Sequence, residues 1–499
     1  MSFALIRSRA QTGTEAPDVR VEVFLSGGLP GFSIVGMAET AVKESRDRVR
    51  GAIVSAGFRL PQQRITVSLA PADMKKTGSR FDLAIAIGIL VASRQLPELP
   101  DRTEFYGELS LNGRLRHVPG LLPAAIAARN EELSMLVPRR SAAEAALAGA
   151  VVYGASSLLA VTAHLTGAEP IEPASPPDLR SNGCCADDLS DVQGQETAKR
   201  ALEIAAAGGH NLLFIGPPGT GKTMLAKRLP GLLPPMSKQE ALQTAAVHSV
   251  LGERLDVDRL FRRPFRSPHH TVSAIALVGG GGSPRPGEIS RAHNGVLFLD
   301  ELPEFNRHTL EVLREPIEAG EVCISRAAYQ LRFPSRFQLV AAMNPCPCGE
   351  LGDVNGRCGC SRDRVRAYRS RLSGPLLDRI DLQVDVARQC LASIRRGAGN
   401  NESSATVAER VADARDVALK RQGCVNANVS GEMLEQLAQV QPGGWALLER
   451  AATQFRLSTR AAYRVLRVSR TIADLSADHQ VTERHVAEAL SLRQLDRET

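Results

Sequence analysis

The sequence predicts an α/β protein of several domains, with a phosphate-binding parallel sheet at its centre and a helical region towards its C-terminal end. A length of 499 residues exceeds what one hydrophobic core normally fills and indicates about three domains. The apolar run "NLLFI" leads into "GPPGTGKT" and then into the helical run "TMLAKRLPGLL", which is the strand, loop and helix order of such sheets. In "RAAYRVLRVSRTIADL", apolar residues recur at the spacing of a packed helix face.

The composition is that of a globular protein without membrane spans. Hydrophobic residues make up 43% and charged residues 23%, and no apolar run reaches the roughly 18 residues that a span requires. The start, "MSFALIRSRAQTG", lacks the pattern of a signal peptide, and the nine cysteines lack the spacing of a disulfide framework. We therefore expect a cytoplasmic protein with no membrane partner. A net charge of +7 permits nucleic-acid binding but does not establish it.

Two seams divide the chain. The stretch "GAEPIEPASPPDLRSNGCCADDLSDVQGQ" is rich in Pro, Ser and Gly and predicts a linker, and "SIRRGAGNNESSATV" is a weaker second seam. Before the first seam, β-rich runs such as "RITVSL" alternate with helical runs such as "FDLAIAIGILVAS", a mixed α/β pattern. The predicted parts are a first domain at 1–166, a linker at 167–190, a phosphate-loop block at 191–388 and a helical region at 389–499.

The stretch "GPPGTGKT" fits the pattern G-x-x-x-x-G-K-[ST] of phosphate-binding loops. Its glycines let backbone N–H groups wrap phosphates at the start of a helix. The lysine is expected to reach the β and γ phosphates, and the following threonine to offer its hydroxyl to Mg²⁺. The predicted nucleotide-binding residues are Gly216, Pro217, Pro218, Gly219, Thr220, Gly221, Lys222 and Thr223.

Polar side chains follow the later strands of the predicted sheet. The run "NGVLFLDELPEF" places Asp300 and Glu301 after a strand, where one carboxylate can hold Mg²⁺ and the next can polarise the attacking water. The strand "FQLVAAMNP" ends in Asn344, whose amide can orient that water. Arg379 follows a helix in "YRSRLSGPLLDRIDLQVDV", where it suits an arginine finger that reaches a neighbouring subunit; a surface salt bridge is the alternative.

These motifs carry a resemblance to a known family. The order of "GPPGTGKT", "LFLDE", "AAMNP" and "GPLLDRID" resembles an AAA+ ATPase of the magnesium-chelatase and MCM-like branch. More closely, "VGMAETAVKESRDRVRGAI", "APADMKKTGSRFDLAIAIGIL" and "LSTRAAYRVLRVSRTIADL" resemble the bacterial ComM/YifB family, and the match covers nearly the whole chain. The resemblance implies an AAA+ core with a helical lid, a homo-hexameric ring and ATP with Mg²⁺ bound between subunits. It also implies that Arg460 contacts the γ-phosphate as a second sensor.

Two inserts in the phosphate-loop block bear on what such a ring acts on. The run "EAGEVCISRAAYQLRFPSRFQ" alternates like a hairpin, and in rings of this branch the corresponding hairpins point into the central channel. Arg326 and Arg332 are therefore candidates for contacts to DNA phosphates, with solvated hairpin arginines as the alternative. His269 and His270, in "RSPHHTV", are candidates for the same channel, although paired loop histidines are as often merely polar.

Four cysteines cluster in "NPCPCGELGDVNGRCGC" between turns of Gly and Pro. Cys346, Cys348, Cys358 and Cys360 are spaced as two C-x-C pairs, and four thiolates suit a tetrahedral structural zinc site. The spacing differs from the commoner C-x-x-C form, and reduced free thiols are the alternative. Such a site is expected to brace the loop after Asn344 without taking part in catalysis.

Residues 1–166 resemble the Lon protease domain, of the ribosomal S5 domain 2-like fold, especially in "GELSLNGRLRHVPGLLPAAIAA". That family uses a serine activated by a lysine. Here Ser79 is displaced from the nucleophile position, and Leu122 stands at or beside the position of the lysine. The domain is therefore expected to be non-proteolytic, a binding or assembly module.

The predicted function is that of an ATPase ring motor on single-stranded or branched DNA. The family resemblance narrows this to a helicase-like protein that promotes branch migration in recombination during natural transformation. One rival is a metal-insertion subunit of the magnesium-chelatase type, and a second is an ATP-dependent protease or protein remodeller. Stimulation of ATP hydrolysis by DNA separates these classes.

Overall fold

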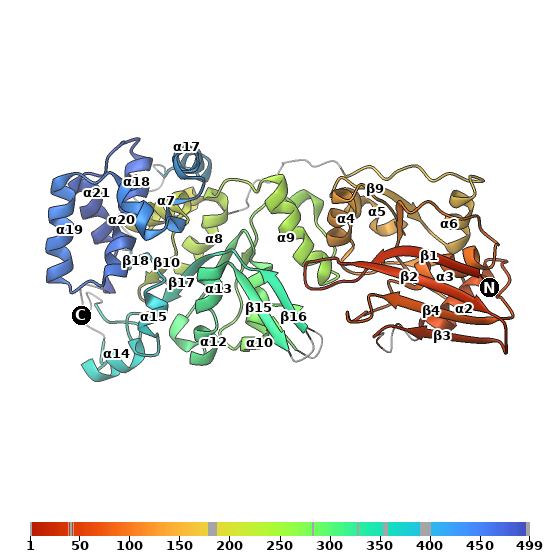
Figure 1. The fold of residues 1–499 in the computed structure, drawn as a ribbon. Helices are drawn as coiled ribbons and strands as arrows, with labels where there is room; N and C mark the ends of the chain where they lie inside the picture. The colour runs from red at the N-terminus through yellow and green to blue at the C-terminus, as the bar shows by residue number, and fades with distance from the viewer. Residues whose placement is uncertain are drawn as a thin grey trace. The chain divides into compact units, whose positions relative to one another are not determined.

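The computed structural model describes residues 2–37, 39, 42, 44–177, 187–281, 284–326, 329–352, 358–389 and 401–495. The chain forms two compact units (Figure 1). The first contains residues 1–181 with 238–260 and 325–333, and the second contains 182–237, 261–324 and 334–499. Among the described residues, no helix combines the length and apolar character needed to cross a bilayer.

The first unit is built on a mixed seven-stranded sheet. Helix α3 (Asp82–Ala92) is almost wholly buried against β1 (Ser2–Arg9) and β2 (Asp18–Ser26), and helix α2 (Ser45–Ser55) packs on α3. The close approach is visible at Gly88, where a Cβ atom would lie 2.6 Å from a Val23 methyl carbon. Across the sheet the strands are β3 (Gly31–Val35), β4 (Arg64–Ala70), β2 (Asp18–Ser26), β1 (Ser2–Arg9), β5 (Thr103–Phe105), β8 (Ser134–Pro138) and β9 (Val151–Ala155). The other elements are α2 (Ser45–Ser55), the strand pair β6 (Glu108–Leu109) and β7 (Leu115–Arg116), α4 (Leu121–Asn130), α5 (Arg139–Ala146) and α6 (Leu158–Leu165).

Helix α9 (Lys238–Val250) belongs to this first unit, although its sequence falls inside the predicted block 191–388. Its buried alanines pack against α4, and the Ser249 carbonyl accepts a hydrogen bond from the Gly120 N–H at 2.8 Å. The short helix η2 (Val257–Arg259) follows α9. The physical reason for the difference is that α4, which packs on α9, lies far away in the chain, and a local sequence pattern does not indicate a distant packing partner.

The second unit contains the predicted parallel sheet. Its five strands are all paired in parallel, in the order β11 (Phe265–Arg266), β14 (Val296–Leu299), β17 (Gln338–Met343), β10 (Leu212–Ile215) and β18 (Leu382–Asp385). Strands β10, β14 and β17 are fully buried, as central strands of a covered parallel sheet are. Helices α7 (Glu196–Gly208) and α8 (Lys222–Leu232) pack against the sheet (Figure 1).

Short elements fill the segments between these strands. The insert after β11 contains α10 (Ala274–Val278), the strand pair β12 (Gly279–Gly280) and β13 (Arg285–Pro286), and α11 (Glu288–Arg291). Beyond β14 lie η3 (Leu302–Glu304), α12 (Arg307–Glu311), α13 (Arg314–Ala319), and the two-stranded hairpin of β15 (Glu321–Arg326) and β16 (Tyr329–Pro334). Between β17 and β18 lie α14 (Arg362–Arg369) and α15 (Gly374–Leu377).

The helical C-terminal region shares one hydrophobic core with the sheet and with α7. The core joins buried residues such as Phe214 of β10 to Val411 of α17 and Ile472 of α20. Helix α20 begins after Ser458, whose hydroxyl caps it by accepting the Ala461 N–H. The helices are α17 (Ser404–Gln422), η4 (Asn426–Asn428), α18 (Gly431–Ala438), α19 (Pro442–Gln454), α20 (Thr459–Leu475) and α21 (Glu483–Ser491).

Both ends of the expected linker pack on their neighbours. Pro173 bridges to Tyr153 of β9, and the Ala174 N–H donates to the Val152 carbonyl at 2.8 Å. At the other end, Leu189 in η1 (Leu189–Asp191) is buried in the core of the second unit. Residues 178–186, within the predicted linker, lie outside the described part of the chain.

Candidate nucleotide-binding site

The phosphate-binding loop connects β10 to α8, as the motif predicts. Gly219 and Gly221 have φ values of +76° and +91°, which side chains rarely tolerate, and a Cβ atom on either would meet nothing within 4 Å. On the inner side, a Cβ atom on Gly216 would lie 2.3 Å from the Val386 carbonyl oxygen. The loop is therefore packed tightly against the sheet and open on its outer side, where backbone N–H groups can receive phosphate oxygens.

Lys222 is almost buried, at 8% exposure, and its ammonium group donates to oxygen atoms of the site. The acceptors are the Gly216 carbonyl at 2.7 Å, the Pro217 carbonyl at 2.8 Å and Asn344 Oδ1 at 3.2 Å. Burial lowers the pKa of Lys222, and the charges of Asp300 and Glu301 partly oppose that shift. A phosphate anion is a stronger partner for this desolvated cation than neutral carbonyls are.

Thr223 and Asp300, the two residues predicted to hold the metal, contact each other directly. The Thr223 hydroxyl donates to Asp300 Oδ2 at 2.7 Å, and Asp300 Oδ1 accepts the N–H of Glu301 at 2.9 Å. A hydroxyl and a carboxylate are the hard oxygen ligands that Mg²⁺ prefers, directly or through water. The donor set therefore fits Mg²⁺ bound with a nucleotide.

The parallel sheet brings these side chains to one edge. Ile215 pairs with Met343, and Leu299 pairs with Ala341, so that the carboxyl ends of three strands lie together. Asn344 and Asp300 follow those strand ends directly. The structure thus assembles five of the predicted residues, namely Lys222, Thr223, Asp300, Glu301 and Asn344.

His270 also contacts this site, which the sequence analysis did not anticipate. Its Nδ1 atom lies 3.3 Å from Glu301 Oε2, and its ring packs edge-on against Phe305 with centroids 6.4 Å apart. The Glu301 side chain is 54% exposed. The rings of His269 and His270 are tilted by 34° with centroids 4.1 Å apart, and His269 Nδ1 forms a hydrogen bond with the Thr271 hydroxyl at 2.9 Å.

Arg379 and Arg460 lie elsewhere. The Arg379 guanidinium donates to the carbonyls of Arg314 at 3.2 Å and Pro375 at 2.6 Å, and it pairs with Glu318 at 2.7 Å. It lines an open pocket together with side chains of α12 and α13. Arg460 is exposed in the first turn of α20. A role of either residue at a neighbouring or bound nucleotide remains a prediction.

The predicted hairpin forms, with Val322 and Ile324 buried on one side of β15. Arg332 is exposed on β16, whereas the side chain of Arg326 lies outside the described part of the chain. The segment 325–333 packs in the first unit, where a Cβ atom on Gly13 would lie 2.8 Å from the Arg332 carbonyl oxygen.

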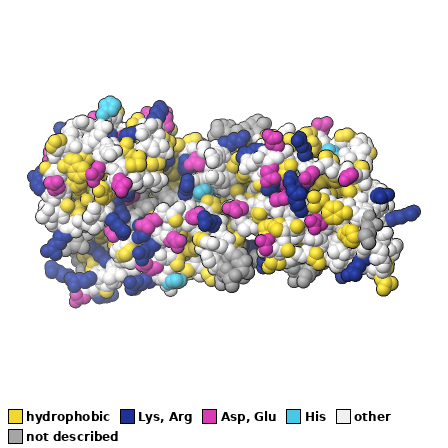
Figure 2. Space-filling view, viewed as in Figure 1, with side chains coloured by type: hydrophobic (Ala, Val, Ile, Leu, Met, Phe, Trp, Pro, Cys, Tyr) yellow, Lys and Arg dark blue, Asp and Glu magenta, His cyan; other side chains and the backbone are white. Residues whose placement is uncertain are grey.

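A second basic surface lies on α14. Arg362, Arg364 and Arg366 are exposed there, and dark blue side chains gather over this helix at the lower left of the view (Figure 2). The sequence signal was present in "SRDRVRAYRSR", whose arginines recur every second or third residue. A cluster of this kind is suited to nucleic-acid phosphates.

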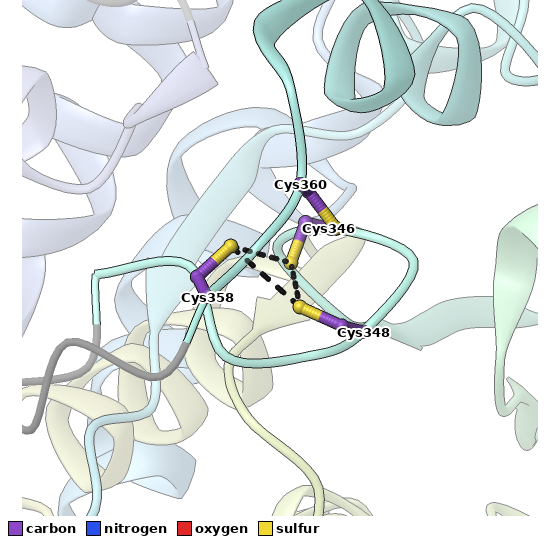
Figure 3. A group of neighbouring side chains, drawn as sticks. All are labelled: Cys346, Cys348, Cys358 and Cys360. Atoms are coloured by element: carbon purple, nitrogen blue, oxygen red, sulfur yellow. Dashed lines mark hydrogen bonds between the residues drawn. The ribbon is translucent and has the colours of Figure 1, made fainter.

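The four predicted metal-ligating cysteines come together (Figure 3). Their sulfur atoms all lie within 4.8 Å of one another, and all four are free thiols. Cys346 is buried, whereas Cys348 is exposed.

Ser79 and Leu122, the two positions compared with the serine and lysine of Lon protease, do not form a serine and lysine pair. The Ser79 hydroxyl donates to the Glu108 carboxylate, and Leu122 is fully buried in the first turn of α4. Lys76, the nearby buried lysine, donates to the Pro71 carbonyl. These contacts are consistent with a non-proteolytic domain.

Three family models match successive parts of the chain. The model described as magnesium chelatase, subunit ChlI, matches residues 188–394, and its C-terminal companion matches 401–493. The model described as subunit ChlI of Mg-chelatase matches residues 21–141. A chelatase description therefore covers part of the first unit as well as the second.

Individual relatives separate into two groups by coverage. Competence protein ComM of Haemophilus influenzae is 48% identical over 503 residues, which cover 100% of this chain and 98% of that protein. YifB of Escherichia coli is 47% identical over 499 residues, again 100% and 98%. The magnesium-chelatase 38 kDa subunit of Acidiphilium rubrum is 29% identical over 329 residues, which cover 59% of this chain and 86% of that subunit. The chain therefore belongs to the ComM/YifB family of magnesium-chelatase-like AAA+ proteins, a membership that implies ATPase activity with ATP and Mg²⁺.

Proposed function

We propose that the protein is an ATP-driven, helicase-like ring motor on DNA that promotes branch migration in recombination during natural transformation. The observation that carries this proposal is the end-to-end match to a protein named for competence, at 48% identity. The arrangement of Lys222, Thr223 and Asp300 supports ATP as the nucleotide that is hydrolysed. The proposed setting is the cytoplasm, where recombining DNA is found.

In the proposed mechanism, Lys222 leaves the loop carbonyls to bind the phosphates, and Thr223 and Asp300 hold the metal. ATP with Mg²⁺ supplies the γ-phosphoryl group that is transferred to water. Glu301 orients and polarises that water, and Asn344 fixes the water or the γ-phosphate from the adjacent strand end. Lys222 Nζ donates to Asn344 Oδ1 at 3.2 Å, and Asn344 directly follows β17. A movement of Lys222 when the γ-phosphate is lost would therefore change a contact at the end of β17.

The proposed ring is a homo-hexamer in which Arg379 reaches the nucleotide of the adjacent subunit. To do so, the guanidinium must exchange its ion pair with Glu318 for the γ-phosphate, which is a stronger bidentate partner. Arg460, in the first turn of α20, is proposed to contact the same γ-phosphate, so that its loss would move the C-terminal helices. Both arginines would complete the site only in the assembled ring.

Two basic surfaces are candidates for the DNA backbone. The first is the hairpin with Arg326 and Arg332, and the second is the exposed face of α14 with Arg362, Arg364 and Arg366. Both would bind phosphates without reading sequence, and binding would weaken as salt rises. His269, in the loop after β11, is a further candidate for a DNA contact.

The test measures ATP hydrolysis by the full chain with no DNA, with single-stranded DNA and with forked DNA, and measures strand exchange on a four-way junction. The motor proposal expects stimulation by DNA and movement of the junction. Glu301→Gln is expected to keep ATP binding and to lower stimulated turnover at least about 100-fold. Normal turnover in Glu301→Gln, or absence of any DNA effect on the wild type, would overturn the assignment.

The second candidate is a metal-insertion subunit of the magnesium-chelatase type. The family descriptions and the alignment over 59% of the chain favour it. It predicts that turnover responds to a porphyrin-carrying partner and not to DNA. A protein-remodelling ATPase is the third candidate. Proteolysis is disfavoured because Leu122 is buried where a catalytic lysine is expected and the Ser79 hydroxyl donates to the Glu108 carboxylate.

A further inference from the structure

The four-cysteine cluster has the geometry of a site for one metal ion. The sulfur of Cys346 lies 3.3 Å from that of Cys348 and 3.7 Å from that of Cys358, and Cys348 lies 3.6 Å from Cys358. Around a tetrahedral zinc ion with Zn–S bonds of about 2.3 Å, the sulfur atoms lie about 3.8 Å from one another. The observed separations are close to this distance, and the four side chains converge on a common point (Figure 3).

The ligand type and the turn geometry favour zinc. Four sulfur ligands without nitrogen or carboxylate oxygen are typical of structural zinc sites, which keep no open position for substrate. Cys346 and Cys348 lie on a turn closed by the Gly349 N–H, which donates to the Cys346 carbonyl at 2.9 Å. Gly349 has a φ of +80°, which permits this sharp turn.

The same turn packs directly on the phosphate-binding loop. A Cβ atom on Gly349 would lie 2.7 Å from Cδ of Pro218 and 3.8 Å from Cγ of Asn344. The cysteine turn begins two residues after Asn344, whose side chain accepts a hydrogen bond from Lys222. The cysteine turn and the ATP site are therefore joined by close packing as well as by their proximity in the sequence.

A second anchor ties the turn to the neighbouring strand. Glu350 Oε1 accepts a hydrogen bond from Arg388 Nη2 at 2.8 Å, and Arg388 lies three residues after the end of β18. The Val386 carbonyl, two residues before Arg388, abuts Gly216 of the phosphate loop. Without an ion, the shape of the turn would depend on these contacts and on weak hydrogen bonds between the thiol groups.

We propose that Cys346, Cys348, Cys358 and Cys360 bind one Zn²⁺ and that this ion holds the 346–349 turn against Pro218, so that ATP turnover depends on the metal. The dependence of ATP turnover on the metal rests on the proposed ATPase function, whereas the proposal of a metal site rests on the geometry of the cysteines alone. The ion acts through the positions of Asn344 and the phosphate loop, and it takes no part in the chemical step.

Metal analysis of the purified full chain tests the site without reference to activity. The expected result is about one zinc per chain in the wild type, as in four-thiolate sites, and a loss of most of it in Cys358→Ser. Cys424→Ser is the matched control, because Cys424 is a partly buried thiol outside the cluster and should leave the zinc content unchanged. Iron in place of zinc, or no metal, would overturn the proposal.

Two variants then separate binding of the ion from its effect on ATP. Cys358→Ser should reduce turnover at least 5-fold together with its zinc, and wild type stripped with a mercurial reagent and chelator should regain turnover when zinc is returned. Pro218→Ala should keep zinc yet weaken binding of a fluorescent ATP analogue, because it removes the ring against which the 346–349 turn packs and leaves the cysteine turn itself unchanged. Circular dichroism checks that each variant is folded.

Full turnover in a folded, zinc-free Cys358→Ser chain would overturn the coupling. Unaltered nucleotide binding in Pro218→Ala would do the same. If the wild type held one zinc but hydrolysed no ATP under any condition, the ATPase proposal would fail while the metal site would stand.

Discussion

His270 Nδ1 lies 3.3 Å from the Oε2 atom of Glu301, the carboxylate that is proposed to activate water. The imidazole comes from the loop after β11, on the insert that leads to α10, whereas Glu301 follows β14. The contact gives the insert a direct connection to the hydrolysis site. A displacement of the insert by a bound partner would move His270 and release the carboxylate.

The first prediction concerns His270→Ala, which removes the restraint on Glu301. Because the pair is partly exposed, the restraint is worth about 1 kcal/mol or less, and basal ATP turnover should rise about 2- to 5-fold. The ratio of DNA-stimulated to basal turnover should fall by the same factor. Steady-state hydrolysis with and without DNA measures both quantities.

His269→Ala is the matched control, because His269 pairs with Thr271 and not with Glu301. It should leave basal turnover within error of the wild type. If both variants lost stimulation equally without any rise in the basal rate, His270 would belong with the DNA-contact candidates instead.

The second prediction concerns Asn344→Ala. The variant removes the acceptor for Lys222 at 3.2 Å but leaves the phosphate loop and the Thr223–Asp300 pair in place. We expect kcat to fall about 10- to 100-fold while the affinity for ATP changes less than about 3-fold, since a positioning group acts mainly in the transition state. Turnover and equilibrium binding of a fluorescent ATP analogue, measured together, check this split. A loss of affinity with kcat unchanged would contradict it.

Much of the candidate site could be predicted from the sequence because parallel strands bring distant motifs to a common edge. Asp300 and Asn344 are each predicted by the end of an apolar strand, and strand pairing alone then places them beside the loop of Lys222. The four cysteines are likewise predicted by their own local spacing. In both cases the information is carried within a few residues of each functional group.

The contacts that could not be predicted depend on longer paths of the chain. His270 reaches Glu301 only through the course of the insert between β11 and β14, and nothing in "SPHHTV" indicates that destination. Helix α9 has a buried face, yet only the fold shows that α4 covers it. The ion pair between Arg379 and Glu318 also depends on how α13 packs, which the local sequence around Arg379 does not specify.

The third prediction uses two variants that are each expected to be inactive. Arg379→Ala lacks the proposed arginine finger, and Glu301→Gln lacks the proposed base. In a mixed ring, a subunit with Glu301 can sit beside a neighbour that carries Arg379, which restores a complete site at that interface. Equal mixing at random should recover about one quarter of wild-type turnover, because heterologous ring interfaces combine residues of both partners.

The rings of the two variants are first dissociated by dilution, and the mixed subunits are then reassembled with ATP and DNA. Recovery is measured as ATP hydrolysis by the reassembled mixture. Arg371→Ala replaces Arg379→Ala in the control mixture, because Arg371 is an exposed arginine of the same region that pairs with Glu304. That variant should be active by itself. Absence of recovery in the test mixture would place Arg379 in its own subunit's site or in a purely structural role.

Asp381 links the start of β18 to the C-terminal helices. Its carboxylate lies 3.4 Å from His210 Nδ1 and 3.9 Å from Arg464 Nε, and it accepts the Asn211 N–H at 3.2 Å. Burial raises the pKa of Asp381, but the hydrogen bond and charge of His210, with the charges of Arg464 and Arg493, outweigh it. The pKa of Asp381 is therefore below its ordinary value.

The fourth prediction follows from the sign of that shift. A carboxyl group with a depressed folded-state pKa contributes stability above its unfolded pKa of about 3.9, and the contribution is lost as the pH falls through the lower folded pKa. Asp381→Asn should therefore destabilise the second unit by about 2 kcal/mol at pH 7, where a buried charge partner is removed. The difference from the wild type should shrink below about pH 3.9 as the native carboxyl group is protonated.

The measurement uses Trp445, the single tryptophan of the chain, which lies on α19 and packs on the core of the second unit. Its fluorescence follows urea unfolding of wild type and Asp381→Asn at pH 7 and pH 3.5. Asp363→Asn, an exposed change on α14, is the control and should match the wild type at both pH values. A deficit in Asp381→Asn that stayed constant over this range would mean that Asp381 stabilises the unit through its shape and neutral hydrogen bonds, because loss of a charge effect must follow protonation.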